Sequence, residues 1–521
     1  MTSRCESMKT GPLPNAFGRA LLWVVTLATV QTGRSENFTL TILHANDLHA
    51  HVEPTKIQEK FYGGYARLAT LVQKYRASDT NVLVLNGGDT FQGTLYFNVY
   101  EGLADLAFMN VVGFDAAATG NHEFDRGPGP LGRFASLAKF PILAANLDVS
   151  AEPALAGRIK AFTVLRVHGQ KIGVVGAVTP VLPDITSPGP NLRMLDLASS
   201  CQNAIDTLRA EGIDKILMVT HVGYEEELDL ARKLRGVDVI IGGHSHTLLG
   251  DLKVDGFASS SGPYPTVVRN ADGDTALVVQ AYEWGKVLGR IKVEFDSAGR
   301  VARWTDAAPI LVDESIAEDL TIKTIVTALQ KPIAEVANQV IGGSANGVSR
   351  TRTANGESPM GTLIADSMLE AMRAQGAVLA CANAGGVRAS FEPGTITYGL
   401  AISVQPFNNT LVLLDLSGAE LITAIEHGVR SGGGMLLMSS ASSYRVDGTK
   451  PPGQQVLDVV IAGEKLDPAK TYRVGFNSFT AGGGDAHQTL KNAKGKRTDT
   501  GILDIDAFID YLKKHSPLEA K

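Results

Sequence analysis

Side chains that bind divalent cations stand at the ends of five short apolar runs in the first half of this 521-residue chain. The candidate ligands at these ends are Asp47, His49, Asp89, Asn121, His221, His244 and His246. An apolar run bounded by turn residues is typical of a buried strand, and ligands of open α/β sheets gather at the carboxyl ends of such strands. We therefore expect these side chains to converge. A mixed oxygen and nitrogen set suits zinc, manganese, iron or cobalt better than a thiolate-selecting ion.

The position of Asp89 indicates what the cations would do. It follows Gly87-Gly88, a turn that lets a carboxylate stand clear of the backbone and bridge two cations. Two cations about 3.5 to 4 Å apart lower the pKa of a shared water and polarise a phosphoryl oxygen. Phosphate ester hydrolysis is the chemistry that most needs such help, because its uncatalysed rate is among the slowest known.

Alternating strands and helices must position these ligands. The chain is too long for one ordinary core, which stops growing near ~250 to 300 residues. Strands alternate with amphipathic helices such as Gly64–Arg76 and Leu197–Glu211, so we expect a layered α/β domain over residues 36–315. Residues 316–340, interrupted by Pro332, predict a helical linker. Residues 341–521 predict a second, α+β domain that begins with a helix at Gly361–Gln375.

Bulk composition excludes some partners. The chain is 44% hydrophobic and 20% charged, and its net charge is -6. No basic field would steer it to a nucleic acid polymer or to anionic lipid. After Cys5, only Cys201 and Cys381 remain, one in each half, and we expect both to be free thiols.

The N-terminus resembles a secretory signal over residues 1–35. Basic residues precede an apolar stretch at Ala20–Val30, which is too short to span a ~30 Å bilayer core but fits a signal h-region. We expect export, with a periplasmic or secreted product. Neither a lipobox cysteine nor a hydrophobic C-terminal tail is visible, so we expect no stable membrane anchor.

The sequence blocks around the ligands resemble a known family. They are Asn46-Asp-Leu-His49, Gly87-Gly-Asp89, Gly120-Asn-His-Glu-Phe-Asp125, Thr220-His221 and Gly242-Gly-His-Ser-His246. These look like the successive signature blocks of the calcineurin-like metallophosphatases. With its second domain, the chain resembles the exported 5′-nucleotidase and UDP-sugar hydrolase family. The resemblance implies a layered β-sandwich flanked by helices in the first domain.

The same resemblance implies two divalent metal ions, with zinc, manganese or cobalt favoured. Asp47, His49, Asp89 and His246 would hold one ion, and Asp89, Asn121, His221 and His244 the other. Some relatives carry Gln or Asn at the position of His246. His122 would not be a ligand. Asp125 would orient its imidazole and favour the charged form, which stabilises charge on the phosphoryl group.

Three turns in the second half, at residues 383–388, 406–409 and 479–485, resemble the nucleotide-binding blocks of that family, and the first and third are rich in glycine. Glycine allows close approach of the backbone, Arg can bind phosphate, and aromatic rings can sandwich a base. The implied contacts are Phe407 and Phe479 on the base, Asp485 on the ribose, Arg388 on phosphate, and Asn383 and Asn409 as polar contacts. A further phosphate contact is expected before the Met360 helix, where Arg352 is preferred over Arg350.

These observations predict an exported enzyme that removes the 5′-phosphate of nucleotides by attack of a metal-bridging hydroxide. The alternatives are a 2′,3′-cyclic-nucleotide phosphodiesterase with 3′-nucleotidase activity, and a UDP-sugar hydrolase. An exported nucleotide-binding protein without catalysis would be expected to lack a ligand or His122, and all are present. The sequence leaves open the native metal pair, the preferred base and the oligomeric state.

Overall fold

The computed structural model describes residues 37–186, 188–352, 357–407, 409–431 and 434–519. The predicted signal segment, residues 1–35, lies outside these ranges. Residues 37–521 form one compact unit by their internal contacts. The boundaries at 315 and 340 between the predicted domains and linker stay predictions.

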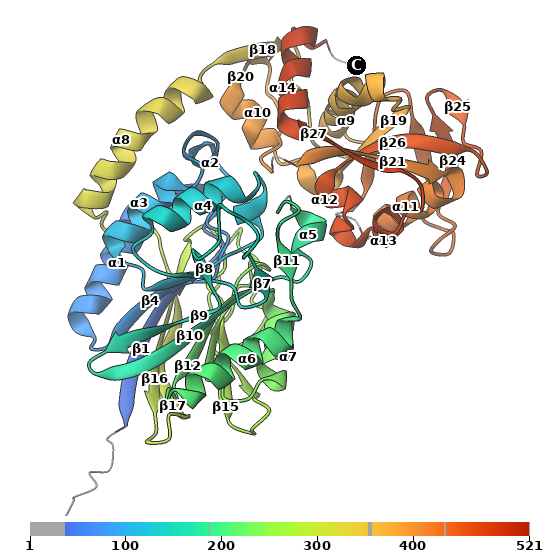
Figure 1. Cartoon of the computed structure of the whole chain (residues 1–521). Helices are drawn as coiled ribbons and strands as arrows, with labels where there is room; N and C mark the ends of the chain where they lie inside the picture. Colours follow the sequence, from blue (N-terminus) through green and yellow to red (C-terminus); the bar gives the residue numbers. More distant parts are fainter. Residues whose placement is uncertain (1–36, 187, 353–356, 408, 432–433, 520–521) are drawn as a thin grey trace, which may run out of the picture. The chain divides into compact units, whose positions relative to one another are not determined.

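Two large sheets build the first half of the chain (Figure 1). The seven-stranded sheet has the order β17 (Val301–Leu311), β16 (Val287–Phe295), β1 (Phe38–Ala45), β4 (Val82–Asn86), β5 (Ala116–Ala118), β6 (Ile142–Leu143) and β8 (Ile159–Lys160). The six-stranded sheet has the order β14 (Thr266–Arg269), β15 (Thr275–Val279), β13 (Val239–Ile241), β12 (Ile216–His221), β10 (Gln170–Val178) and β9 (Phe162–Val167). All five apolar runs that precede candidate ligands are strands, as predicted.

The core lies on both faces of the seven-stranded sheet. Along β1, Leu40 and Ile42 join a cluster that includes Val219 and Ile240 of the second sheet, while Leu43 belongs to a cluster with the α1 helix on the opposite face. Side chains of a strand alternate between faces, so a strand buried on both sides reads as a continuous apolar run. This confirms the predicted layered α/β arrangement.

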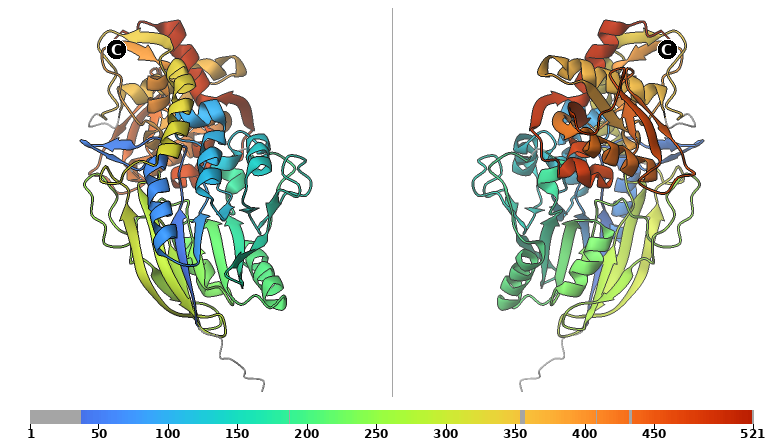
Figure 2. Two further views of the ribbon diagram at one scale, coloured as in Figure 1. Left: turned by 90° about the vertical axis from the view of Figure 1, so that its left-hand side faces the viewer. Right: turned by 90° about the vertical axis from the view of Figure 1, so that its right-hand side faces the viewer.

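Helices cover the outer faces of the two sheets (Figure 2). On the first sheet lie α1 (Tyr65–Ser78) and α3 (Leu103–Val112), which supply Leu68, Val72 and Met109 to the core. On the second lie α6 (Leu197–Ala210) and α7 (Tyr224–Lys233). The predicted helices at 64–76 and 197–211 therefore match α1 and α6 to within two residues.

The linker helix is shorter than predicted. The helix α8 runs over Leu320–Ala337, and Asp319 caps it by accepting a hydrogen bond from the Ile322 N–H at 2.8 Å. Pro332 lies inside the helix without ending it. The next residues form strand β18 (Val340–Ser344), so the helical prediction to residue 340 was too long.

A five-stranded sheet organises the second half. Its order is β22 (Leu436–Met438), β19 (Leu379–Asn383), β26 (Thr471–Asn477), β21 (Thr410–Ser417) and β27 (Arg497–Leu503). The helices α9 (Pro359–Met372), α11 (Gly418–Ser431) and α14 (Asp504–His515) accompany it, and α9 confirms the helix predicted there.

Cys201 and Cys381 are both buried and free, as predicted. Among the described helices, none has the length and apolarity needed to cross a bilayer.

Candidate active site

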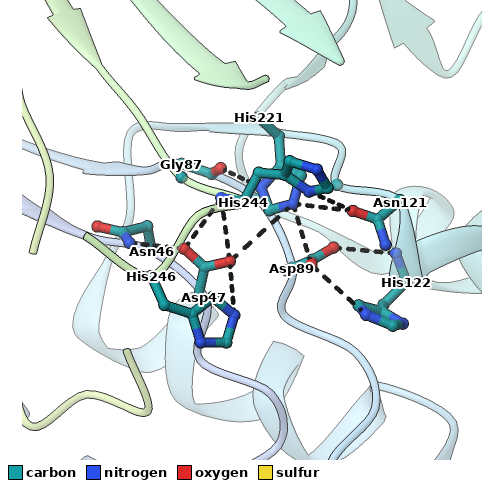
Figure 3. Close-up of polar contacts among 12 residues, drawn as sticks. Asn46, Asp47, Gly87, Asp89, Asn121, His122, His221, His244 and His246 are labelled. Carbon is teal, nitrogen blue, oxygen red and sulfur yellow. Dashed lines mark hydrogen bonds and ion pairs between the residues drawn. The ribbon is translucent and has the colours of Figure 1, made fainter. Parts of the chain in front are cut away.

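The seven predicted ligands emerge from the carboxyl ends of five strands and meet in one place. Figure 3 labels six of them, all except His49. β1, β4 and β5 pair in parallel in one sheet, and β12 and β13 do so in the other. Asp47, Asp89 and Asn121 follow the first three of these strands, His221 ends β12, and His244 follows β13. Parallel pairing puts the strand ends of each sheet at one edge, which is why residues far apart in sequence converge.

The ligand atoms fall into two groups. Asp47, His49 and His246 form one group and Asp89, His221 and His244 the other, and in each the candidate ligand atoms lie within 4.8 Å of one another. The Oδ2 atom of Asp89 lies 3.0 Å from His221 Nε2 and 3.8 Å from His49 Nε2. Its carboxylate therefore stands between the two groups, where a bridging ligand must be.

The amide of Asn121 joins the second group. Its Oδ1 atom lies 2.8 Å from His244 Nδ1 and 3.2 Å from His221 Nε2. Because an amide oxygen is a neutral ligand, Asn121 would add coordination to a cation held by this group without adding charge.

The imidazoles are oriented as metal ligands. The Nδ1 atom of His49 lies 3.0 Å from Phe91 O, and that of His221 lies 2.8 Å from Gly87 O. A carbonyl oxygen can only accept, so each Nδ1 carries a hydrogen, and each Nε2 is the nitrogen that faces the centre and is left to bind a cation. His49 Nε2 and His246 Nε2 face each other at 3.0 Å. Lone pairs this close repel unless a cation or proton lies between them, so the donor set fits divalent metal ions.

Charge within the cluster is balanced by mutual contacts. Burial alone would raise the pKa of Asp89, but His221 and His122 hold it well below its usual value. Burial lowers the pKa of His221, yet Asp89 outweighs it and raises that pKa to about 9. Burial lowers the pKa of His49 to about 4. The protein thus keeps Asp89 ionised and His49 neutral, and a bound cation would displace the proton of His221.

The ligand-bearing backbone is held in an uncommon conformation. Residues with side chains rarely adopt positive φ, and such residues cluster at functional sites. Here φ is 50° at Asp47, 48° at His49, 50° at Asp89, 77° at His244 and 50° at His246. Close packing also requires glycine at position 120, where a Cβ atom would lie 2.0 Å from Asp89 Oδ1.

His122 lies beside the ligands and pairs with Asp125. Its Nδ1 atom is 2.6 Å from Asp125 Oδ2, and its Nε2 atom is 3.9 Å from Asp89 Oδ2. Burial would lower the pKa of His122, but Asp125 and Asp89 raise it to about 10. The side-chain amide of Gln92 donates to Asp125 Oδ2 at 3.0 Å and to the Phe407 carbonyl at 2.9 Å. Asp125 therefore orients His122 and favours its charged form, and His122 belongs to neither ligand group.

One cavity of about 360 Å³ joins this centre to the residues predicted to bind a nucleotide. The predicted site residues that line it are Asp89, Asn121, His122, Asp125, His244, His246, Asn383, Arg388, Phe407, Asn409, Phe479 and Asp485. Asp47, His49 and His221 are buried and do not line it. The Arg388 guanidinium lies 5.7 Å from the centre of the Phe407 ring.

Neither candidate arginine of the 350–352 segment lines the cavity. The Arg350 guanidinium donates to the Arg388 carbonyl at 2.8 Å, and Arg352 Nη1 lies 3.8 Å from Met435 Sδ. The structure therefore does not bring Arg352 to the other predicted contacts, and its phosphate-binding role stays a prediction. Arg350 instead supports the backbone of Arg388.

Several supporting residues were missed by the sequence analysis. Glu123 is buried, and its carboxylate accepts hydrogen bonds from Thr90 N at 2.7 Å and Gly120 N at 2.8 Å, fixing two ligand loops. Its place inside the Gly120–Asp125 block was the available signal. Gln92 and Glu283 gave no comparable signal, because each acts through contacts with residues distant in sequence.

Comparison with known proteins agrees with this geometry. Residues 40–248 match the calcineurin-like phosphoesterase family, and residues 332–492 match the 5′-nucleotidase C-terminal domain. The chain is 38% identical to a 5′-nucleotidase of Diplobatis ommata, over 96% of this chain and 92% of that protein. It is 35% identical to a 5′-nucleotidase of Mus musculus, over 95% and 91% of the two chains.

A solved structure shows the same fold. A 5′-nucleotidase precursor from Thermus thermophilus superposes with a TM-score of 0.77 at 43% identity, over 93% of this chain and 97% of that one. Sequence, structure and site geometry therefore agree on the same two-part architecture. The chain belongs to the 5′-nucleotidase family and is a metal-dependent phosphoric monoester hydrolase.

Proposed function

We propose that this enzyme removes the 5′-phosphate of nucleotides at a centre of two divalent ions, releasing a nucleoside and phosphate. One observation carries the proposal. The cavity that exposes Asp89, His122 and His244 at one end also exposes Phe407, Phe479 and Asp485. A phosphate bound at the ligands and an aromatic base bound between two rings would be the two ends of one nucleotide.

The ligand groups support a dinuclear centre bridged by Asp89. Asp47, His49 and His246 would hold one ion, and Asn121, His221 and His244 the other. Such ions, when bound, lower the pKa of a water molecule and polarise the phosphoryl oxygens. We favour zinc, manganese or cobalt, because imidazole, amide and carboxylate donors occur together.

His122 would neutralise charge on the phosphoryl group. Its pKa, raised by Asp125 and Asp89 against the effect of burial, keeps a proton on both ring nitrogens at neutral pH. With Nδ1–H held by Asp125, the Nε2–H is the one that can donate to the phosphoryl or leaving oxygen. A fixed donor needs no reorganisation as charge develops.

The second half would hold the nucleoside. Phe407 and Phe479 would stack on the base. Asp485 would accept hydrogen bonds from the ribose hydroxyls, because Asn383 Nδ2 already fixes its carboxylate at 3.0 Å. Asn383 is fixed in turn by Asn477 Nδ2 at 3.0 Å. This chain of amides supports a preorganised ribose site.

A substrate panel tests the proposal. Phosphate release by the purified enzyme with added zinc, manganese or cobalt is measured with 5′-AMP, 3′-AMP, 2′,3′-cyclic AMP and UDP-glucose. We expect 5′-AMP to be the best substrate and a chelator to abolish turnover. A failure to release phosphate from any nucleotide with any of these ions would contradict it.

A second cavity favours a second candidate activity, cleavage of the phosphoanhydride bond of UDP-sugars. It measures about 660 Å³ and shares His122, His246, Arg388 and Phe407 with the first cavity. The sugar phosphate of a UDP-sugar would have room in this second cavity, beside Trp284 and His51. UDP-glucose in the panel decides whether this space is used.

Export belongs to the proposal as well. The apolar stretch at 20–30, preceded by basic residues, supports a cleaved signal. N-terminal sequencing of the protein recovered from outside the cytoplasm of an expressing host tests this, and an intact Met1 on the recovered protein would contradict it.

A further inference from the structure

A buried lysine behind the metal-ligand groups has no part in the proposed reaction. Lys286 is 1% exposed, and its Nζ lies 4.2 Å from the ring centre of Trp284, 4.4 Å from that of Tyr282 and 5.1 Å from that of Phe257. A fully buried lysine is rare unless it is paired. Its ion partner is Glu283, whose Oε1 lies 2.5 Å away.

Glu283 connects this lysine to a metal ligand. Its second oxygen, Oε2, lies 2.5 Å from His246 Nδ1. A carboxylate can only accept, so Nδ1 carries a hydrogen, and Nε2 is the nitrogen of His246 that is left to bind a cation. That Nε2 faces Asp47 Oδ1 at 3.3 Å and His49 Nε2 at 3.0 Å. Glu283 thus selects the tautomer of His246 that can bind a cation between these ligands.

The backbone around Glu283 is strained and anchored. Tyr282 and Trp284, on either side of it, have φ of 60° and 57°, a region that side-chain-bearing residues rarely adopt. Asn46 Nδ2 donates to the Tyr282 carbonyl at 2.8 Å, and Trp284 N donates to the Asp47 carbonyl at 2.7 Å. The strained turn is therefore tied to the strand exit that carries Asp47.

Aromatic stacking and two ion pairs hold the Glu283 turn in place. The Trp284 ring stacks on His51, with ring centres 4.2 Å apart and an angle of 6° between the planes, and His51 Nδ1 lies 2.8 Å from the His49 carbonyl. Lys286 occupies Oε1 and His246 occupies Oε2, so both oxygens of Glu283 are engaged. The carboxylate is thereby kept from turning inward to bind a cation itself.

We propose that Glu283, held by Lys286, is a positioning residue that fixes His246 as an Nε2 donor and so sets the metal affinity of the group formed by Asp47, His49 and His246. This rests on the ligand role proposed above for His246. Carboxylates that orient a ligating histidine typically contribute about 10- to 100-fold in metal affinity. We expect an effect of that size, confined to one of the two bound ions.

Zinc affinity of the metal-free full-length enzyme tests the proposal. Competition with a chromophoric chelator gives a dissociation constant for each of the two equivalents, without any activity measurement. Glu283→Ala should weaken one equivalent by about 10- to 100-fold, and Glu283→Gln by about tenfold, since a neutral amide is a poorer acceptor. The other equivalent should be unchanged. Lys292→Met, which removes an ion pair between strand β16 and Asp79 at the C-terminal end of α1, is the control and should change neither.

His246→Ala separates this inference from the proposed function. If His246→Ala leaves both equivalents as tight as in the wild type, the proposed ligand role is wrong. If His246→Ala weakens one equivalent and Glu283→Gln does not, only the inference is overturned. Because Glu283 acts through His246, adding Glu283→Gln to His246→Ala should cause no further loss. Glu283→Gln is nearly isosteric, so it carries the test if Glu283→Ala folds poorly.

Discussion

The Nδ1 atom of His122 lies 2.6 Å from Oδ2 of Asp125, three residues further along the same turn. Burial opposes a charged imidazole, but Asp125 and Asp89 raise the pKa of His122 to about 10. The imidazolium lines the cavity next to the metal-ligand groups. A cation fixed by a neighbouring carboxylate can stabilise a phosphoryl group without being a metal ligand.

Replacing His122 by Ala should therefore lower kcat for 5′-AMP by about 10²- to 10⁴-fold, the usual contribution of a proton donor. KM should change little, because the base contacts remain. Asp125→Asn should cause a smaller loss in kcat, since the imidazole stays but is no longer held by a charge. Steady-state phosphate release measures both variants.

The metal content of His122→Ala provides the control. His122 belongs to neither ligand group, so the variant should bind zinc as the wild type does. His168→Ala, on a turn far from the ligands in sequence, should leave kcat unchanged. Unchanged turnover in His122→Ala would show that this side chain has no catalytic role.

Phe407 and Phe479 should act on substrate binding. Both line the cavity, and an aromatic contact contributes about 0.5 to 1.5 kcal/mol beyond its buried area. Phe407→Ala and Phe479→Ala should each raise KM for 5′-AMP by about tenfold, with kcat within a few-fold of wild type. Ribose 5-phosphate, which lacks a base, is the internal control. If its KM rises equally, the rings do not stack on the base.

Metal removal should destabilise the protein as well as inactivate it. Ions that bind only the folded state stabilise it by an amount that grows with the logarithm of their free concentration relative to Kd, so a chelator should lower the unfolding temperature. Asp89→Asn should weaken both zinc equivalents, because Asp89 lies between the two ligand groups. Calorimetric unfolding and metal analysis measure these effects. Loss of only one equivalent in Asp89→Asn would argue against a bridging role.

The convergence of the candidate metal ligands could be predicted from the sequence because each block follows a local pattern. The first ligand of each block stands at the end of a buried strand or in the turn directly after it, and parallel pairing converts that shared position into proximity. Apolar runs and their polar ends can be read from one sequence. The helix of residues 64–76 could be predicted for a similar reason, because apolar residues recur at helical spacing along its buried face.

Long-range contacts could not be predicted in this way. Glu283 follows His246 by 37 residues and reaches it only because the turn after β15 is anchored to Asn46. Gln92 contacts Phe407 from 315 residues away in sequence. Arg352 was chosen from a motif spacing, but it does not line the cavity, and its Nη1 atom lies 3.8 Å from Met435 Sδ. No local pattern encodes such pairings, since they depend on tertiary packing.

Asp105 should make stability depend on pH. It is fully buried, and burial raises its pKa to about 7, although a hydrogen bond from Tyr65 opposes the shift. The folded state then binds a proton that the unfolded state releases between about pH 4 and 7. The contribution of Asp105 to the free energy of unfolding is therefore fully present below about pH 4. It falls by about 1.4 kcal/mol per pH unit as the pH rises toward about 7.

Asp105→Asn should remove this dependence. Urea unfolding of metal-free wild type and variant, at about pH 5 and about pH 8, gives the difference in free energy of unfolding. Other groups titrate alike in both proteins, so the variant should gain on the wild type as the pH rises. An equal change with pH in the two proteins would mean that Asp105 is ionised in the folded state throughout.

Gly120→Ala should disable the centre through a single methyl group. The added Cβ would lie 2.0 Å from Asp89 Oδ1 and 2.4 Å from Asp89 N, so the carboxylate between the two ligand groups must move. Misplacement of about 1 Å can cost about 10²-fold in rate, and we expect at least this loss in kcat/KM together with weaker zinc binding. Gly448→Ala is the matched control, because nothing lies within 4 Å of its added Cβ. If Gly120→Ala kept wild-type zinc affinity and turnover, Asp89 would not need its observed position, and the bridging geometry would be wrong.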